Sequence, residues 1–221
     1  MPENTYTLLK SRRYEEALKL TDTLPREALD SEPELYTAAF RSARNALNGA
    51  LNQKLFAPAA RFLSRARFYL KKSSDFPELL HKNKIDPELE AIKLLKQELR
   101  LYSWRGDYNI LQSMEPEVFK ETSALSGKFP EEACKIYMVF AIVFSRLTGK
   151  FTDRAIFYME QVELVLTQNP GLKQSGFFRE SIKRGRAFLH LRSRNFHEAG
   201  MLFKDLYRIT GDRKDYIFQL F

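Results

Sequence analysis

Apolar residues recur along most of the chain at intervals of three and four positions, which places them on one side of an α-helix. The clearest case is the segment from Glu34 to Asn52, whose apolar positions are Tyr36, Phe40, Ala43, Leu47 and Leu51. Strict alternation of apolar and polar residues, which indicates strands, is rare, while the helix formers Leu, Ala, Glu, Lys and Arg are abundant. The pattern predicts an all-α fold.

A helical hairpin is predicted at the centre of the fold, from Cys134 to Thr167. Its first helix is apolar without a break from Ile136 to Phe144, which is typical of a helix buried on all sides. This run is too short to cross the roughly 30 Å apolar layer of a membrane. Gly149 is expected to end the helix in a left-handed conformation, and Thr152 to cap the next one.

Further helices are expected on both sides of this hairpin, with bounds set by capping residues, prolines and glycines. The expected segments are Arg13 to Leu24, Glu34 to Asn52 capped by Ser31, Ala57 to Lys72, a helix from Pro87 capped by Asp86, a short helix that follows a turn at Gly106 and ends near Met114, Pro116 to Leu125, a helix from Pro130, Phe177 to Ser193, Phe196 to Ile209, and the start of a helix at Asp212. Ser73 to Asp86 is predicted to be a longer polar connection.

A short pattern recurs at the start of the second helix of each predicted pair: an aromatic residue, then a small or apolar residue three positions later. The copies are Tyr14–Ala17, Phe56–Ala59, Tyr108–Leu111, Phe151–Ala155 with one extra residue, and Phe196–Ala199, at intervals of 42 to 52 residues. The aromatic is expected to fill the gap where two antiparallel helices diverge, and the small residue to let their backbones approach. Since one hairpin cannot bury its outer face alone, the hairpins are expected to stack.

This pattern resembles the tetratricopeptide repeat, in which a Gly-x-aromatic-x-x-Ala turn is followed by apolar or small residues four and seven positions after the Ala. Ala199 with Phe203 and Leu206 fits it, as does Ala59 with Leu63 and Ala66. The intervals exceed the family's 34 residues, and the Trp and Leu-Gly pair of the family's first helix is missing.

The resemblance implies a right-handed α-solenoid of about four to five antiparallel hairpins, in a single domain over residues 1–221; another kind of α-solenoid is the alternative. The first repeat lacks most of a helix, and the chain finishes on an apolar segment from Ile217 to Phe221. Two interpretations stay open: a piece of a longer array, or terminal aromatic residues that dock on a partner or a second copy.

The formal net charge of +8 favours an anionic partner. No acidic residue occurs between Glu34 and Asp75, whereas this stretch contains Arg41, Arg44, Lys54, Arg61, Arg65, Arg67, Lys71 and Lys72. The single cysteine, Cys134, lies in the most apolar segment, and we expect a buried core thiol. With no disulfide possible and no secretory signal in the first ten residues, the expected location is the cytoplasm.

No enzyme motif is found along the chain. The histidines, His81, His190 and His197, lack the spacing of a zinc protease, and Gly149-Lys150 is followed by Phe rather than by the Ser or Thr of a phosphate loop. We therefore expect no catalytic residues, no metal and no cofactor.

Polar side chains form a stripe opposite the apolar positions on two of the predicted first helices, at spacings of three and four. In stacks of this family such helices line a concave groove, so the stripe implies a site for an acidic or extended peptide. Arginine offers a planar fork for carboxylates, and asparagine can bond both backbone groups of a bound chain. The predicted peptide-binding residues are Arg41, Arg44, Asn45, Asn48, Asn52, Lys93, Lys96, Gln97 and Arg100. The competing interpretation is an ordinary solvated helix surface.

The alternative partner is RNA or DNA. The segments Arg61 to Tyr69 and Lys183 to Arg186, with Arg192 and Arg194, could supply phosphate contacts, and exposed aromatic rings could stack on bases. However, Phe62, Phe68 and Tyr69 are expected to be buried, and no regular set of side chains recurs per repeat. The sequence therefore favours a non-catalytic scaffold that binds protein or peptide.

Overall fold

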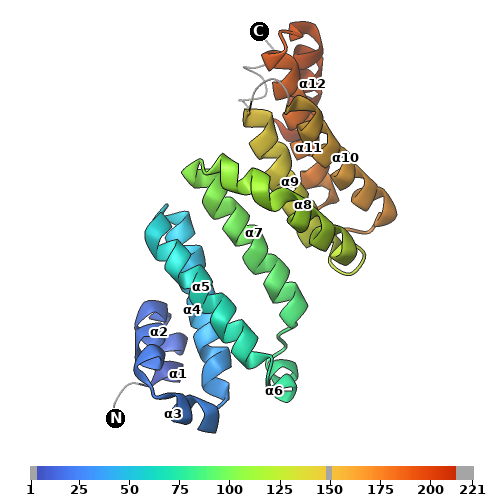
Figure 1. Ribbon diagram of the computed structural model, residues 1–221. Helices are drawn as coiled ribbons and strands as arrows, with labels where there is room; N and C mark the ends of the chain where they lie inside the picture. The colour runs from blue at the N-terminus through green and yellow to red at the C-terminus, as the bar shows by residue number, and fades with distance from the viewer. Residues whose placement is uncertain (1–3, 148–150, 213–221) are drawn as a thin grey trace. The chain divides into compact units, whose positions relative to one another are not determined.

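The computed structural model describes residues 4–147 and 151–212, and every regular element in these two ranges is an α-helix (Figure 1). No helix in these ranges combines the length and the apolar character needed to cross a membrane. The helices are α1 (Thr5–Lys10), α2 (Tyr14–Thr23), α3 (Arg26–Ser31), α4 (Glu34–Asn52), α5 (Phe56–Ser73), α6 (Pro77–Lys82), α7 (Pro87–Arg105), α8 (Tyr108–Leu125), α9 (Pro130–Arg146), α10 (Thr152–Gln168), α11 (Ser175–Arg192) and α12 (Phe196–Thr210). The turn expected at Gly149 and the helix expected beyond Asp212 lie outside the described residues.

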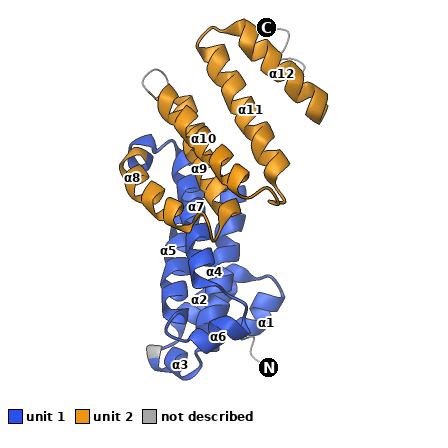
Figure 2. Ribbon diagram, turned by 90° about the vertical axis from the view of Figure 1, so that its right-hand side faces the viewer, with its two compact units in different colours: residues 1–111 blue, residues 112–221 orange. Residues whose placement is uncertain are grey.

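The chain divides into two compact units, residues 1–111 and residues 112–221 (Figure 2). In the first unit, α4 and α5 form the central antiparallel pair; α2 packs on α4, and α7 packs on α5. The predicted apolar stripe of α4 is buried at all five positions and forms one core with residues of α5, among them Ala59, Leu63 and Tyr69. The all-α prediction is confirmed.

In the second unit, α9 and α10 pack against each other, as the sequence predicted. Stacked and tilted aromatic rings fill their interface, with Tyr158 of α10 in contact with Tyr137, Phe140 and Phe144 of α9. Two details of the prediction were wrong. Ile142 is 42% exposed, so α9 keeps one face in water. Thr152 begins α10 instead of capping it, because the helix starts directly after Phe151.

Five helices of the described residues, α1, α4, α6, α7 and α11, end in the same hydrogen-bonded turn. A residue in left-handed conformation follows the helix, and the N–H of the next residue bonds to the carbonyl five positions earlier, the Schellman arrangement. The left-handed residues are Arg12, Lys54, Lys84, Gly106 and Arg194, and the bonds span 2.8 to 3.0 Å. After four of these turns, at Arg12, Lys54, Gly106 and Arg194, the aromatic residue of the repeated pattern begins the next helix.

The small or apolar residue of the repeated pattern is fully buried in all five copies, Ala17, Ala59, Leu111, Ala155 and Ala199. This agrees with its expected position where two helices approach. The aromatic residue behaves less regularly. Phe56 packs against the core, whereas Phe196 is 51% exposed and does not fill a gap between helices.

Three other expectations were wrong. Helix α8 is continuous through Pro116, with Leu111 buried before the proline and Val118 and Thr122 buried after it. The polar connection after Ser73 contains α6, which buries Leu80. Ser31 does not cap α4; its hydroxyl donates to the carbonyl of Ala28.

The two glycines at Gly49 and Gly106 should respond oppositely to the same substitution. Gly49 lies inside α4 with open space around its missing side chain, so Gly49→Ala should raise the free energy of unfolding by about 0.5–1 kcal/mol. Gly106 has a φ of +80°, which strains any residue with a side chain, so Gly106→Ala should lower the free energy of unfolding by about 1 kcal/mol. Urea unfolding followed by circular dichroism measures both.

Lys54→Gly provides the complementary test, because it relieves a side chain held at φ of 57°. The relief of strain, offset by the greater freedom of glycine in the unfolded chain, should raise the unfolding free energy by about 0.5 kcal/mol.

If Gly49→Ala and Gly106→Ala both raised or both lowered the free energy of unfolding, backbone conformation would not be what constrains the turn at Gly106.

Candidate functional site

The polar stripes of α4 and α7 lie in the first unit and face each other. Arg44 on α4 and Lys93 on α7 both reach the carboxylate of Glu90, with Arg44 Nη1 at 2.7 Å and Lys93 Nζ at 2.9 Å. Glu90 is buried, and the sequence analysis did not single it out. The two predicted binding residues therefore converge on a carboxylate of their own chain.

Other predicted residues extend this contact along the two helices. Asn48 Oδ1 accepts a hydrogen bond from Gln97 Nε2 at 2.8 Å, and Arg100 Nη1 donates to Gln97 Oε1 at 2.9 Å. At the other end, Arg41 Nη2 donates to the carbonyl of Asn83 at 2.8 Å. We call the set Arg41, Arg44, Asn48, Asn83, Glu90, Lys93, Gln97 and Arg100 the α4–α7 network. It uses the predicted side chains to join helices.

The α4–α7 network keeps Glu90 ionised. Burial by itself would raise the pKa of Glu90, but the hydrogen bonds from Lys93 and Arg44 outweigh it and hold the pKa below its ordinary value of 4.5. Removing a partner would leave a buried charge unpaired, which is strongly destabilising. The network is therefore a structural element of the first unit.

The basic stretch is neutralised in a similar way by acidic residues from neighbouring helices. Arg67 of α5 holds Glu98 of α7 with two hydrogen bonds, of 2.9 and 2.6 Å, and Arg65 forms an ion pair with Asp22 of α2. Within the described part of the chain, Lys54, Arg61 and Lys71 have no ion-pair partner. The exposed positive charge is thus smaller and more local than the sequence suggests.

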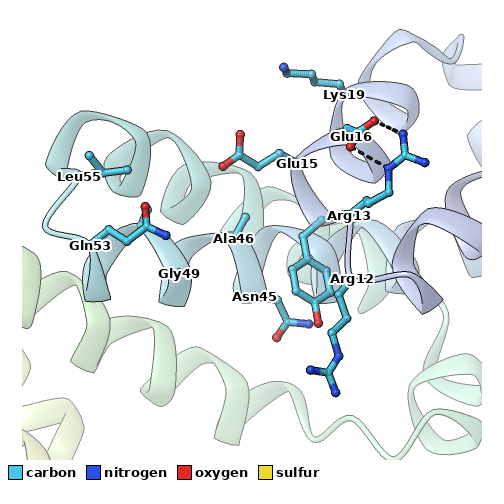
Figure 3. Close-up of a pocket in the computed structure, with 12 residues that line it drawn as sticks. Arg12, Arg13, Glu15, Glu16, Lys19, Asn45, Ala46, Gly49, Gln53 and Leu55 are labelled. Atoms are coloured by element: carbon cyan, nitrogen blue, oxygen red, sulfur yellow. Dashed lines mark hydrogen bonds and ion pairs between the residues drawn. The ribbon is translucent and has the colours of Figure 1, made fainter.

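One predicted residue, Asn45, lines a pocket of about 420 Å³ between α2 and α4, which we call the α2–α4 pocket (Figure 3). In Figure 3, Asn45, Ala46 and Gly49 follow one another along α4, opposite residues at the start of α2. The lining residues are Arg12, Arg13, Tyr14, Glu15, Glu16, Lys19, Asn45, Ala46, Gly49, Ala50, Gln53 and Leu55.

Most polar side chains of the α2–α4 pocket have unused hydrogen-bonding capacity. Arg13 pairs with Glu16, with Nε at 2.8 Å from Oε1. By contrast, the side chains of Arg12, Glu15, Lys19, Asn45 and Gln53 make no hydrogen bond or ion pair with a described residue. Arg12, Lys19 and Gln53 were not among the predicted residues, because they lie outside the polar stripes of α4 and α7. The two remaining predicted residues do not line this pocket: Asn52 is exposed at the end of α4, and Lys96 is half-buried on α7.

The segments considered for nucleic acid are only partly as expected. Tyr69 is buried and Phe62 packs against the core, but Phe68 is 53% exposed, so the expectation of a buried ring was wrong there. In the second segment, Lys183 pairs with Asp205 and Arg186 with Glu163, at 3.5 and 2.8 Å. Intramolecular pairing therefore reduces the charge of the second segment as well.

Among the described residues, the single thiol and the possible metal ligands are the side chains considered for reactive or coordinating geometry. Cys134 is fully buried, and burial, with a smaller effect from Glu131, raises the pKa of its thiol to about 12. The thiol therefore stays protonated at neutral pH. In residues 4–147 and 151–212, no three His, Cys, Asp or Glu side chains gather as a metal site would require.

Comparisons of the chain with protein-family models, with curated proteins and with solved structures found no match. Function is therefore inferred from the geometry of these sites.

The charge on Glu90 should be visible in the pH dependence of stability. At neutral pH, Glu90→Gln should lower the free energy of unfolding by about 2 kcal/mol, the value of a hydrogen bond to a charged group. Because the folded pKa lies below 4.5, this contribution is present above pH 4.5 and is lost as the pH falls through the folded value. The difference in unfolding free energy between wild type and variant should narrow as the pH falls below about 4.5, as measured by urea unfolding.

Glu78→Gln is the matched control, since Glu78 is an exposed carboxylate in the same unit. It should change stability by less than about 0.5 kcal/mol at every pH. If Glu90→Gln lowered the free energy of unfolding by the same amount at neutral and at acidic pH, the shape of the side chain and not its charge would determine the role of Glu90.

Proposed function

We propose that the chain is a non-catalytic, tetratricopeptide-like right-handed solenoid of the cytoplasm that binds a segment of another protein. The observation that carries the proposal is the α2–α4 pocket, where Arg12, Glu15, Lys19, Asn45 and Gln53 make no side-chain hydrogen bond or ion pair with a described residue, while the side chains of the neighbouring α4–α7 network are paired. A pocket with a few convergent polar groups is a common arrangement of binding sites.

The repeated turns support the solenoid part of the proposal. Four turns between successive helices share a left-handed residue, a bond across five positions and an aromatic residue at the start of the next helix. A turn that recurs with the same geometry gives successive hairpins similar shapes, and similar hairpins can stack in a regular array.

The chemistry of the pocket favours an acidic or extended segment. Arg12 and Lys19 supply two cations without acidic partners, against the single unpaired carboxylate of Glu15. The side-chain amides of Asn45 and Gln53 can each donate and accept, so they match the N–H and C=O groups of an extended backbone. The α4–α7 network fixes the other face of α4, and a fixed wall reduces the entropy lost on binding.

Reversing the charge of the pocket should abolish binding without unfolding the protein. Random peptides displayed on phage and selected on the wild-type chain should be enriched in Asp and Glu. The double variant Arg12→Glu, Lys19→Glu should bind the selected peptides at least about tenfold more weakly, equivalent to about 1.4 kcal/mol, as measured by fluorescence anisotropy.

A second double variant, Lys120→Glu with Lys204→Glu, controls for net charge, because both lysines are exposed and lie outside the pocket. It should retain binding within about twofold. Equal losses in the two variants would show a general charge effect and would contradict the assignment to the pocket. Capture from lysate that disappears after nuclease treatment, in place of peptide binding, would favour the nucleic-acid alternative.

A further inference from the structure

We propose that the first unit has a second docking surface, on α5, for an acidic peptide anchored by one large apolar side chain. The surface consists of the exposed ring of Phe68, the pocket beside it, and the lysines and arginine that flank it on α5. It is distinct from the α2–α4 pocket, since the two pockets share no lining residue, and it does not depend on the function proposed for that pocket.

The pocket beside Phe68 has a volume of about 350 Å³ and lies among α2, α4 and α5, with Leu29 of α3 in its lining. We call it the Phe68 pocket; its lining residues are Thr21, Asp22, Leu24, Leu29, Tyr36, Phe68, Tyr69 and Lys72. Leu29, Tyr36 and Tyr69 are buried and provide an apolar floor. The volume is near the lower end of ligand pockets, about 300–1,000 Å³, which suits a single large side chain.

Phe68 forms an exposed wall of this pocket. Its ring packs edge-on against Tyr69, with centroids 5.2 Å apart, while about half of the residue stays in water. A partner's apolar side chain in the pocket would cover this ring, and burial of apolar surface is favourable in proportion to its area.

The polar groups around the pocket are already paired, which distinguishes it from the α2–α4 pocket. Tyr69 donates to Asp22 Oδ1 at 2.7 Å, Asp22 also pairs with Arg65, and Tyr36 donates to Asp30 at 2.6 Å. Thr21 donates to the carbonyl of Ala17 at 2.9 Å. An apolar side chain would leave none of these groups without a partner. A nucleobase, whose edges need hydrogen bonds, would find little unused capacity, so the occupant is an apolar side chain.

The charge of the rim determines what flanks that side chain. Arg61 and Lys71 are exposed on α5 and have no ion-pair partner among the described residues. Lys72, which lines the pocket, has only a long 3.9 Å contact with the exposed Asp75. An excess of cations around an apolar pocket complements acidic residues on both sides of an apolar anchor.

Fluorescence anisotropy with defined probes tests this surface. The probe is a labelled nonapeptide of Asp and Glu with a central Phe, and the matched probe has a central Ala. The Phe probe should bind with a dissociation constant tighter than about 1 mM, and the Ala probe at least about tenfold more weakly. Both Phe68→Ala and the pair Lys71→Glu, Lys72→Glu should weaken the Phe probe by at least about tenfold, without changing the circular dichroism spectrum.

The double variant Lys120→Glu, Lys204→Glu should retain Phe-probe binding within about twofold, and so should Arg12→Glu, Lys19→Glu. These two controls separate this surface from net charge and from the α2–α4 pocket. A probe lost only with Arg12→Glu, Lys19→Glu would lie in the α2–α4 pocket and would overturn the present proposal while supporting the other.

Four further outcomes would also overturn it. The first is equal binding of the Phe and Ala probes, which would mean attraction by charge alone. The second is tighter, Phe68-dependent binding of a single-stranded oligonucleotide. The third is absence of saturable binding of the Phe probe up to about 1 mM. The fourth is self-association that Phe68→Ala abolishes in sedimentation velocity, because a second copy of the chain would then cover the ring.

Discussion

Glu90 and Glu98 lie on α7 about two helical turns apart, and each meets an arginine from a different helix. Arg44 comes from α4 and Arg67 from α5, so the two carboxylates connect α7 to both members of the central pair. Both glutamates are buried, although the side chains of Arg44 and Arg67 stay 32% and 46% exposed, so each pair contributes about 1.5–3 kcal/mol, the range of a hydrogen bond to a charged group. A shift of α7 along α4 or α5 would break at least one pair. The ion pairs therefore favour one register of α7 in addition to the apolar packing of the core.

The same pairing determines where positive charge stays without an internal partner. Between Glu34 and Asp75 the chain is basic without interruption, yet Arg44, Arg65 and Arg67 are neutralised inside the unit by residues of α7 and α2. Among the cations that have no ion-pair partner in the described residues, Arg12 and Lys19 lie before and on α2, and Arg61 and Lys71 lie on α5. Both proposed sites therefore lie beside cations whose charge is not neutralised inside the unit. This explains why two separate concavities of the first unit, one polar and one apolar, are both bordered by positive charge.

Local signals predicted the fold well and the contacts poorly. The bounds of α4 and the cap of α7 by Asp86 followed from periodicity and from residues a few positions apart. The local preference of proline for the start of a helix led to a wrong boundary at Pro116, where α8 continues and buries Val118 and Thr122. The left-handed turns at Arg12, Lys54 and Arg194 were not predicted, because none of these positions is a glycine. The pair of Arg44 with Glu90 joins residues 46 positions apart. Periodicity indicates which face of a helix is polar, but not what that face meets.

A general physical reason explains why most residues of the predicted polar stripe pair with a neighbouring helix. In a layered helical fold, a polar face opposite the apolar stripe meets either water or the polar face of the next helix. Where the two faces are complementary, as for Asn48 with Gln97 or Arg44 with Glu90, they pair, and their side chains join helices. The side chains of Asn45, Arg12 and Lys19 form no such pair with a described residue, although the carboxylate of Glu15 lies in the same pocket, and they keep their hydrogen-bonding capacity for water or for the proposed peptide. A count of charges along one helix cannot distinguish these two outcomes, because the distinction depends on the neighbouring helix.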